Sequence, residues 1–465
     1  MNREQGNTMV DKRALDVQRK RVTVVGLGRS GAAACKLLVS RGALVTGSDH
    51  RPAEEIETNL ADLERRGVRC EFGRHRLETF LQADLIILSP GVESNLPLLQ
   101  QARSQGVRVW SEVELAFRAT EASFVAITGT NGKSTTTTLI GLMVKHAGKK
   151  AIVAGNIGTA LCDVVPGLSP EYWVVAEISS FQLETIEAFR PQVALLLNVT
   201  PDHLDRYADL AQYSGAKARI FLNQQSHDMA ILNADDPLTV EAGAQGKARQ
   251  IFFSQRQAVK EGAFLKEETF WLRLGGKGEA ICSRQDLKIR GAHNTENVLA
   301  ALAAAGLLGV PSHSMREVLK QFGGLEHRLE AVAEIAGVQY INDSKGTNVG
   351  ATVKSLESFP AGKVVLIAGG LDKGADFRPL IPPVKERVKA TILIGQAREK
   401  LQATLQGVCP VQEAASLEGA VEAAATLAAQ GDVVLLSPAC ASFDMFRDFE
   451  ERGRAYKAAV KRLRD

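Results

Sequence analysis

The strongest constraint on the fold is an alternation of short apolar strands with helical segments. The first three strands are "RVTVVGLG" from Arg21, "ALVTGSD" from Ala43 and "ADLIILSPG" from Ala83, and each ends at a glycine or polar turn. Strands that alternate with helices form parallel α/β sheets. Ligands bind such sheets beyond the carboxyl ends of the strands, so the residues that follow each strand are the first candidates for function.

The same alternation divides the chain. Segments between about Arg249 and Gly291, such as "GAFLKEETFWLRL", have short apolar runs and glycine turns that indicate antiparallel strands. From about Glu326 the α/β pattern restarts with "VQYINDSKG". We therefore predict a polar N-terminal extension followed by three domains, with boundaries near Ser123 and Leu325. The predicted ranges are 1–20, 21–122, 123–325 and 326–465.

Composition and charge limit the partners. Of the 465 residues, 45% are hydrophobic and 23% are charged, which is typical of a soluble globular protein. A net charge of +3 gives no support for nucleic-acid binding. The N-terminus lacks the apolar core of a signal peptide, and no stretch reaches the roughly 18 apolar residues of a membrane span. Because the six cysteines are scattered without a CxxC pair, we expect reduced thiols in a cytoplasmic protein.

The first of two glycine-rich loops follows the first strand. It has the pattern Gly26-x-Gly28-x-x-Gly31, and Asp49 ends the next strand. In NAD-binding Rossmann domains, an acid about 20 residues after such a loop binds the ribose. The pattern therefore favours an NAD-dependent oxidoreductase. The loop alone leaves two alternatives open, a tight strand-to-helix turn and a site for another nucleotide.

The second loop, in "VAITGTNGKSTTTTLI" from Val125, has the composition of a phosphate loop. Its glycines let backbone N–H groups approach phosphate oxygens, Lys133 can meet the terminal phosphates, and Ser134 supplies a hydroxyl for magnesium. Ile127 stands where the usual GxxxxGK[ST] pattern has its first glycine, so the loop is a shorter variant. The predicted ATP-binding residues of this loop are Gly129, Thr130, Asn131, Gly132, Lys133, Ser134 and Thr135.

The string TGTNGKST resembles the ATP loop of the Mur ligases and of their relative folylpolyglutamate synthase. The resemblance implies an ATP-dependent, amide-forming enzyme with three α/β domains. The first and third would be Rossmann-like, and the central P-loop ATPase-like domain would combine a parallel sheet with a small antiparallel sheet. In Mur ligases the first domain holds the UDP of a nucleotide-sugar precursor, which accounts for the first loop without NAD. The implied precursor-binding residues are Gly28, Arg29, Ser30, Asp49, Arg51, Ser89, Gly91 and Asn156.

Two further strands end at candidate magnesium ligands. Glu177 ends "VVAE", and His203 follows Asp202 in "NVTPDH". The resemblance implies that Ser134 and Glu177 hold one Mg²⁺ and that His203 helps to hold a second. It also matches Lys217 to the lysine that carries a carbamate in this family, whereas spacing alone predicts an exposed helix residue. Further nucleotide contacts implied by the resemblance are Asn297, Arg328 and Asp343.

The C-terminal strings narrow the resemblance within the family. "NDSKGTN", "GGLDKGADF" and "SPACASFDMFRDF" are most similar to the members that add D-glutamate to UDP-N-acetylmuramoyl-L-alanine. A dicarboxylate acceptor needs cations and hydroxyl groups. The implied D-glutamate pocket comprises Lys345, Thr347, Lys373, Ser442, Phe443 and Phe449. Phe443 stands where the family pattern has leucine.

The resulting hypothesis is an ATP-dependent ligase that forms an acyl phosphate, with D-glutamate as the attacking amine. The residues expected to serve the reaction directly are Lys133, His203, Lys217 and Lys345. We expect a monomer that uses ATP and two Mg²⁺ ions and has no nucleic-acid or membrane partner. The alternatives are another Mur ligase or folylpolyglutamate-synthase-like ligase, an NAD-dependent oxidoreductase, and a non-catalytic ATP-binding switch.

Overall fold

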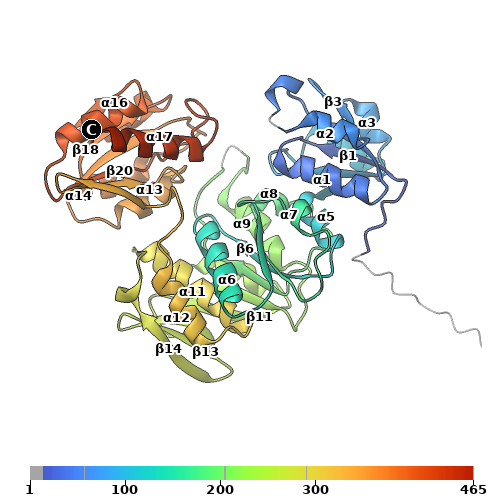
Figure 1. Cartoon of the computed structure of the whole chain (residues 1–465), viewed down its shortest axis with the longest axis horizontal. Coiled ribbons are helices and arrows are strands. Elements are labelled where there is room, and N and C mark those ends of the chain that lie inside the picture. Colours follow the sequence, from blue (N-terminus) through green and yellow to red (C-terminus); the bar gives the residue numbers. More distant parts are fainter. Residues whose placement is uncertain (1–13, 57, 204–205, 290, 464–465) are drawn as a thin grey trace, which may run out of the picture.

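A computed structural model describes residues 14–56, 58–203, 206–289 and 291–463. Most of the predicted polar extension, residues 1–13, lies outside the described residues. The rest forms three lobes, each built on its own sheet (Figure 1). The sheets have five, nine and six strands in chain order, and helices accompany each of them. The predicted α/β fold class is therefore confirmed.

The first sheet is parallel throughout and has the strand order β3-β2-β1-β4-β5. This is the order of a Rossmann half, in which the chain reverses direction across the sheet beside β1. The strands are β1 (Arg21–Val25), β2 (Leu44–Ser48), β3 (Arg69–Glu71), β4 (Leu85–Leu88) and β5 (Arg108–Ser111). The helices are α1 (Arg29–Ser40), α2 (Leu60–Arg65), α3 (Leu77–Leu81) and α4 (Pro97–Ser104), with a short 3₁₀ helix η1 (Ala53–Glu55).

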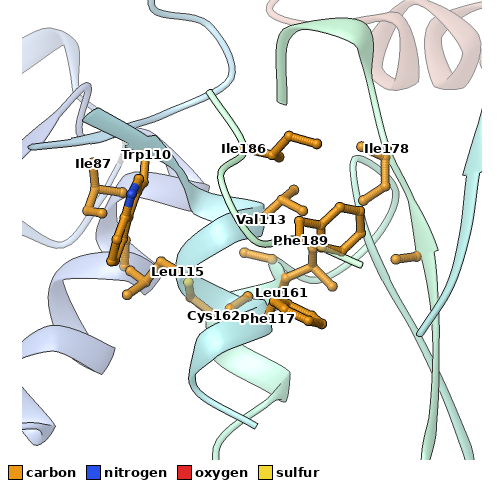
Figure 2. Close-up of a cluster of buried hydrophobic side chains, with 14 of the residues drawn as sticks. Ile87, Trp110, Val113, Leu115, Phe117, Leu161, Cys162, Ile178, Ile186 and Phe189 are labelled. Carbon is orange, nitrogen blue, oxygen red and sulfur yellow. The ribbon is translucent and has the colours of Figure 1, made fainter. Parts of the chain in front are cut away.

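Helix α5 (Glu112–Arg118) joins the first lobe to the central one. It begins directly after β5, where the side chain of Ser111 caps it by accepting a hydrogen bond from the Glu114 backbone N–H. Its apolar residues pack into a cluster that draws on both lobes, and Figure 2 shows Val113 and Phe117 beside Phe189. The first lobe is therefore fixed to the central one by a continuous apolar core.

The central sheet has the order β14-β13-β12-β11-β10-β9-β6-β8-β7. The strands from β7 to β12 in this order are parallel, and β12, β13 and β14 pair antiparallel. The strands are β6 (Ser123–Thr128), β7 (Ala151–Gly155), β8 (Trp173–Glu177), β9 (Val193–Leu196), β10 (Met229–Asn233), β11 (Arg249–Ser254), β12 (Gly262–Lys266), β13 (Thr269–Leu274) and β14 (Lys277–Ser283).

The structure differs from the sequence prediction at this antiparallel region. The strands continue the main sheet rather than forming a separate one, and β11 is parallel to both of its neighbours. Gly262 makes the junction possible, because it has φ 129° and a Cβ atom there would collide with the carbonyl oxygen of Phe252. A glycine in a strand often marks such a close backbone approach. The periodicity of the segment does not reveal which strands pair.

The central helices lie at the two faces of this sheet. Helix α11 packs against α6 and against β11 to β13, and its residues from Val298 to Ala305 are buried on every side. A helix that is apolar all round belongs in a core. The helices are α6 (Lys133–His146), α7 (Leu161–Val164), α8 (Ser180–Leu183), α9 (Leu210–Ala218), α10 (Pro237–Ala244), α11 (Ala292–Leu307) and α12 (Ser312–Gln321), with 3₁₀ helices η2 (Arg219–Phe221) and η3 (Arg284–Asp286).

The third sheet has the order β15-β16-β20-β17-β18-β19, and only its edge strand β15 is antiparallel among the described strands. The strands are β15 (Glu330–Ile335), β16 (Val338–Asn342), β17 (Val364–Gly369), β18 (Val388–Ile394), β19 (Val411–Glu413) and β20 (Val433–Leu436). The helices are α13 (Val349–Leu356), α14 (Ile381–Arg387), α15 (Arg398–Leu405), α16 (Leu417–Leu427) and α17 (Phe449–Arg462), with the 3₁₀ helix η4 (Arg378–Leu380). Apolar clusters cover both faces. None of the helices in the described ranges is long and apolar enough to cross a membrane.

Candidate functional site

The second glycine loop connects β6 to α6. Gly129 and Gly132 have φ 151° and 85°, which favour glycine, and a Cβ atom on Gly132 would collide with the Asn297 side chain. The loop is also tied to the end of β9, because the Asn131 backbone N–H donates to Asn198 Oδ1 at 2.9 Å. The N-cap position of α6, Gly132, makes no side-chain capping bond within the described structure. Because the first N–H groups of any helix lack partners within the helix, this helix end is suited to an anion.

Lys133 is folded back onto its own loop. Its Nζ donates to the carbonyl oxygens of Gly129 and Thr130, both at 2.8 Å. Burial lowers the pKa of Lys133 below its ordinary value, against an opposing effect of Glu177. A phosphate placed over the loop would offer this ammonium stronger, charge-assisted partners than two neutral carbonyls.

Glu177 stands at the end of β8, beside the loop. Its Oε1 accepts a hydrogen bond from Asn156 Nδ2 at 3.0 Å, whereas its buried Oε2 has no hydrogen-bond partner among the described residues. A buried carboxylate oxygen without a partner calls for a cation or water. Ser134 lies in the first turn of α6, and its Oγ accepts a hydrogen bond from Arg328 Nη2 at 3.1 Å. A hydroxyl and a carboxylate are oxygen ligands of the kind that Mg²⁺ prefers.

The structure overturns the spacing-based prediction for Lys217. Only 1% of the residue is exposed, because Tyr213, Ala216 and Lys217 form the buried face of α9. Its Nζ donates to the Gly129 carbonyl at 2.9 Å and lies 4.2 Å from the centre of the Tyr213 ring. Burial, reinforced by Lys133, lowers the pKa of Lys217 well below its ordinary value. The helix period allowed either face to be buried, and only the packing of α9 decided between them.

His203 occupies the loop after β9 in a left-handed conformation, with φ 55°. Its backbone N–H donates to the adjacent Asp202 carboxylate at 2.9 Å, and its ring packs edge-on against Phe181 with centroids 4.8 Å apart. Asp202 in turn accepts from Asn348 Nδ2 of the third lobe at 2.9 Å. The segment that carries His203 is therefore in direct contact with the third lobe.

A cavity of about 210 Å³ brings these elements together between the central and third lobes. It contains most of the residues predicted for ATP, together with two from the predicted acceptor pocket. The predicted residues in its wall are Thr130, Asn131, Gly132, Lys133, Thr135, Asn156, Glu177, His203, Asn297, Arg328, Asp343, Lys345 and Thr347. Three further predicted residues are hydrogen-bonded next to this wall. The Gly129 carbonyl accepts from Lys133 and from Lys217, and Ser134 Oγ accepts from Arg328.

Arg328 and Asp343 belong to the start of the third lobe. The Asp343 carboxylate accepts from Ser355 Oγ at 2.6 Å and from Ser437 Oγ at 2.7 Å. Burial raises its pKa to about 6, against the opposing effect of these hydrogen bonds. Arg328 reaches across to Ser134 on α6. A ligand in the cavity would therefore contact both lobes at once.

The residues predicted for the acceptor are only partly brought together. Lys345 Nζ lies 3.6 Å from the centre of the Phe449 ring, and burial lowers the pKa of Lys345 to about 8. Thr347 also lines a neighbouring cavity of about 650 Å³ that extends to the exposed Lys373. Ser442 is buried and Phe443 is 64% exposed, and within the described ranges neither lines these two cavities.

Sequence reasoning missed two residues that shape this site. Asn198 lies two residues after the end of β9 and anchors the phosphate loop, so its position after a strand was a usable signal. Arg452 on α17 is 1% exposed, and its guanidinium donates to the carbonyl oxygens of Ser344 at 2.9 Å and Cys440 at 3.2 Å. It thereby holds two strand-end loops of the third lobe in place. Helical spacing was a usable signal, because Arg452 lies on the same helix face as the buried Tyr456 and Val460.

The first glycine loop ends in a different arrangement. Asp49 is 1% exposed, and its Oδ2 accepts hydrogen bonds from the Leu27 N–H at 2.8 Å and from Arg51 Nη2 at 2.9 Å. Its Oδ1 accepts from Arg51 Nε at 3.1 Å. Burial acts to raise the pKa of Asp49, but these bonds and the Arg51 charge prevail and lower it to about 2. Its two oxygens are thus engaged within the chain, which disfavours the ribose contact of an NAD site.

The other residues predicted for the precursor follow the same sheet edge, apart from one. Gly28 is the N-cap of α1, and Ser89 Oγ donates to the Gly26 carbonyl at 2.7 Å. Arg29, Ser30 and Arg51 follow β1 and β2, and Gly91 follows β4. Asn156 instead lies at the end of β7, in the wall of the cavity beside the phosphate loop.

Comparison with known proteins accounts for all three lobes. The family model for the Mur ligase MurD-like N-terminal domain matches residues 20–111, the Mur ligase middle domain 127–305, and the Mur ligase glutamate ligase domain 327–440. The chain belongs to the Mur ligase family. A Mur ligase of Koribacter versatilis, named UDP-N-acetylmuramoylalanine–D-glutamate ligase, is 47% identical over 97% of this chain and 99% of its own. The protein of the same name from Geotalea daltonii is also 47% identical, with the same coverage.

Two solved ligase structures share the fold. The UDP-N-acetylmuramate-alanine ligase MurC of Thermotoga maritima superposes with a TM-score of 0.60 at 21% identity, covering 96% of this chain and 99% of its own. A pseudomurein peptide ligase type C from Methanothermus fervidus gives a TM-score of 0.61 at 19% identity, with 96% and 100% coverage. The similarity to both extends through all three lobes, so the three-domain architecture is that of the family.

Proposed function

We propose that this Mur ligase joins D-glutamate to UDP-N-acetylmuramoyl-L-alanine at the expense of ATP, in peptidoglycan precursor synthesis. The observation that carries the proposal is the cavity between the central and third lobes, where the phosphate loop faces Arg328 and Lys345. The name shared by relatives 47% identical over nearly the whole chain supports D-glutamate as the acceptor. We also propose the domain ranges 21–122, 123–325 and 326–465 and a monomer that works in the cytoplasm.

The carboxylate of the precursor attacks the γ-phosphate of ATP, which gives an acyl phosphate and ADP. Lys133 turns from the Gly129 and Thr130 carbonyls to the β- and γ-phosphates and neutralises charge as the phosphoryl group is transferred. The amine of D-glutamate then attacks the acyl carbon, and the tetrahedral intermediate loses phosphate. The chain supplies position and charge rather than a covalent nucleophile.

The residues present fit Mg²⁺, because Glu177 offers a buried oxygen that lacks a partner among the described residues and Ser134 offers a hydroxyl. These two would hold one ion, and His203 would help to hold a second. Bound Mg²⁺ would supply charge neutralisation and orientation of the phosphates. We propose that Lys217 contributes as a carbamate. Its lowered pKa favours the neutral amine that reacts with carbon dioxide, and its burial against the phosphate loop places it next to this site.

D-Glutamate would bind on the third lobe. Lys345 and Lys373 would meet its carboxylates, while Thr347 and Ser442 donate hydrogen bonds. Lys345 and Thr347 line the cavity that holds the phosphate loop, and Lys373 lines the adjoining one. The ring face of Phe449 contacts the Lys345 ammonium and stabilises its charge. Phe443 and Ser442 lie outside both cavity walls as described, so their contact would require the lobes to close around the substrates.

Phosphate release from ATP in the presence of UDP-N-acetylmuramoyl-L-alanine tests this function. Turnover is expected with D-glutamate and not with L-glutamate, L-alanine or meso-diaminopimelate. Turnover with one of the other amino acids in preference to D-glutamate would assign a different ligase activity. Tight NAD binding without ADP formation would refute the ligase altogether.

A further inference from the structure

Arg206 spans the boundary between the first and central lobes. Its guanidinium donates to the carbonyl oxygens of Val92 at 3.1 Å and Pro90 at 3.5 Å, in the loop after β4. The same group donates to Glu184 Oε2 of the central lobe at 3.0 Å. The side chains of Arg206 and Glu184 are only 13% and 15% exposed, so this ion pair is largely withdrawn from solvent. Such partly buried, charge-assisted bonds hold a defined geometry.

A continuous set of side chains connects Arg206 to the proposed metal site. The guanidinium lies 3.9 Å from the centre of the Phe181 ring. The same ring contacts His203, with ring centroids 4.8 Å apart. Tyr207 stacks on Phe181 and donates its hydroxyl to Glu184 Oε1 at 2.6 Å. A displacement of Arg206 would therefore be felt at His203.

The loop that Arg206 contacts is also held by hydrogen bonds of its own lobe. The Ser89 N–H donates to the Val25 carbonyl at 3.0 Å, Ser89 Oγ donates to the Gly26 carbonyl at 2.7 Å, and the Val92 N–H donates to the Ser89 carbonyl at 3.0 Å. These bonds lie wholly within the first lobe. Arg206 consequently fixes where the loop sits relative to the central lobe, rather than how the loop is folded.

We propose that Arg206 is a positioning residue. It sets the distance between the loop after β4, which carries the predicted precursor-binding residues Ser89 and Gly91, and the phosphate loop of the central lobe. The inference rests on the proposed function, in which one end of the precursor binds at the first lobe and its carboxylate must reach the γ-phosphate. A misplacement of about 1 Å in such a geometry costs on the order of 100-fold in rate. A substrate fragment confined to the first lobe would not sense this distance.

The test compares Arg206→Ala with the wild type. The kcat with the full precursor is expected to fall on the order of 10- to 100-fold. The Kd of UDP alone, measured by calorimetry, is expected to stay within about twofold, since UDP would be held by the first lobe alone. Arg206→Gln, which retains one amide donor, should lie between the two and serves in place of the alanine variant if that one does not fold.

Arg219 provides the matched control. Its guanidinium donates to the carbonyl oxygens of Leu183 at 2.7 Å and Ile186 at 3.2 Å, next to Glu184 but wholly within the central lobe. Arg219→Ala should lower the melting temperature and leave kcat and the UDP Kd within about twofold of wild type.

Three results would overturn the positioning role of Arg206. They are a wild-type kcat in the Arg206 variants, an equal fall in kcat for Arg219→Ala, or a loss of UDP affinity that parallels the loss of kcat. A wild type without turnover on UDP-N-acetylmuramoyl-L-alanine and D-glutamate would refute the proposed function and this inference with it. An active wild type with unchanged variants would refute the inference alone.

Discussion

The two glycine loops have similar sequences but different surroundings. Both follow a central parallel strand and begin a helix, α1 in the first lobe and α6 in the central one. At the first loop, Asp49 is neutralised by Arg51 and by a backbone N–H of the loop itself. At the second, Glu177 keeps one buried oxygen without a partner among the described residues, while Lys133 and Lys217 lie at the same carbonyl of Gly129.

In the first loop the charged groups are paired with each other, whereas in the second a buried carboxylate oxygen lacks a partner among the described residues. The first loop needs no ion to be stable, which suits a site that holds a ligand by shape and backbone hydrogen bonds. The second holds a buried Lys217 and a half-buried Lys133, whose pKa values burial lowers, and a bound phosphate would offset their charge. The four predictions below test this contrast, beginning with the largest expected effect.

Lys133→Ala should abolish phosphate release, with a fall in kcat on the order of 10³, because no other group on the loop can neutralise the transferring phosphoryl charge. The fold should persist, since the hydrogen bonds of the lysine ammonium within the described residues go to carbonyls of its own loop. Steady-state turnover and circular dichroism would measure the two effects. Lys150→Ala, which removes an exposed pair with Glu171, is the control and should be as active as wild type. A Lys133→Ala enzyme with near wild-type turnover would show that this is not the ATP loop.

Lys217→Ala should reduce kcat by on the order of 100-fold or more, because a carboxylate-like metal ligand is lost from a buried position. Acetate should restore part of the activity by filling the vacated space, and Lys217→Arg should not respond to it. Turnover measured across an acetate titration would distinguish the two variants. A fully active alanine variant would contradict the carbamate.

Asp49→Ala should raise the KM for the UDP precursor by on the order of 10- to 100-fold. The variant loses the charge-assisted hydrogen bonds that hold Arg51 and the Leu27 N–H in the geometry of the first loop, and such bonds are worth about 1.5–3 kcal/mol. The KM for ATP should not change, because the two loops belong to different sheets. Calorimetry on the wild type should show binding of UDP and none of NAD. An equal rise in both KM values would mean that the loops do not act separately.

The smallest expected effect concerns Lys345, whose titration should make the kcat/KM for D-glutamate depend on pH. Its pKa is lowered to about 8, so the cation that meets a D-glutamate carboxylate is present below pH 8 and is lost as the pH rises above that value. The kcat/KM for D-glutamate should therefore fall about tenfold between pH 7 and pH 9. In Lys345→Arg this fall should disappear, because a guanidinium stays charged throughout. A profile that is the same in both enzymes would assign the titration to another group.

Local sequence determined the positions where function could lie. The strand-then-turn pattern placed Glu177 at the end of a strand and Lys133 and His203 in segments that follow strands. Parallel strands bring their carboxyl ends to one edge of a sheet whatever the rest of the chain does. The phosphate loop was identifiable because its chemistry resides in consecutive residues. The match of C-terminal strings then indicated the acceptor, a conclusion that periodicity could not have reached.

Only the tertiary structure decided which polar groups are satisfied and which are buried. The burial of Lys217, the pairing of Asp49 with Arg51, the reach of Arg328 to Ser134 and the bridge made by Arg206 all depend on how elements pack. Most of these contacts join residues that are tens or hundreds of positions apart, and helical period allows more than one face to be buried. The sequence therefore determined where the chemistry could be, and non-local packing decided how it is charged and held in place.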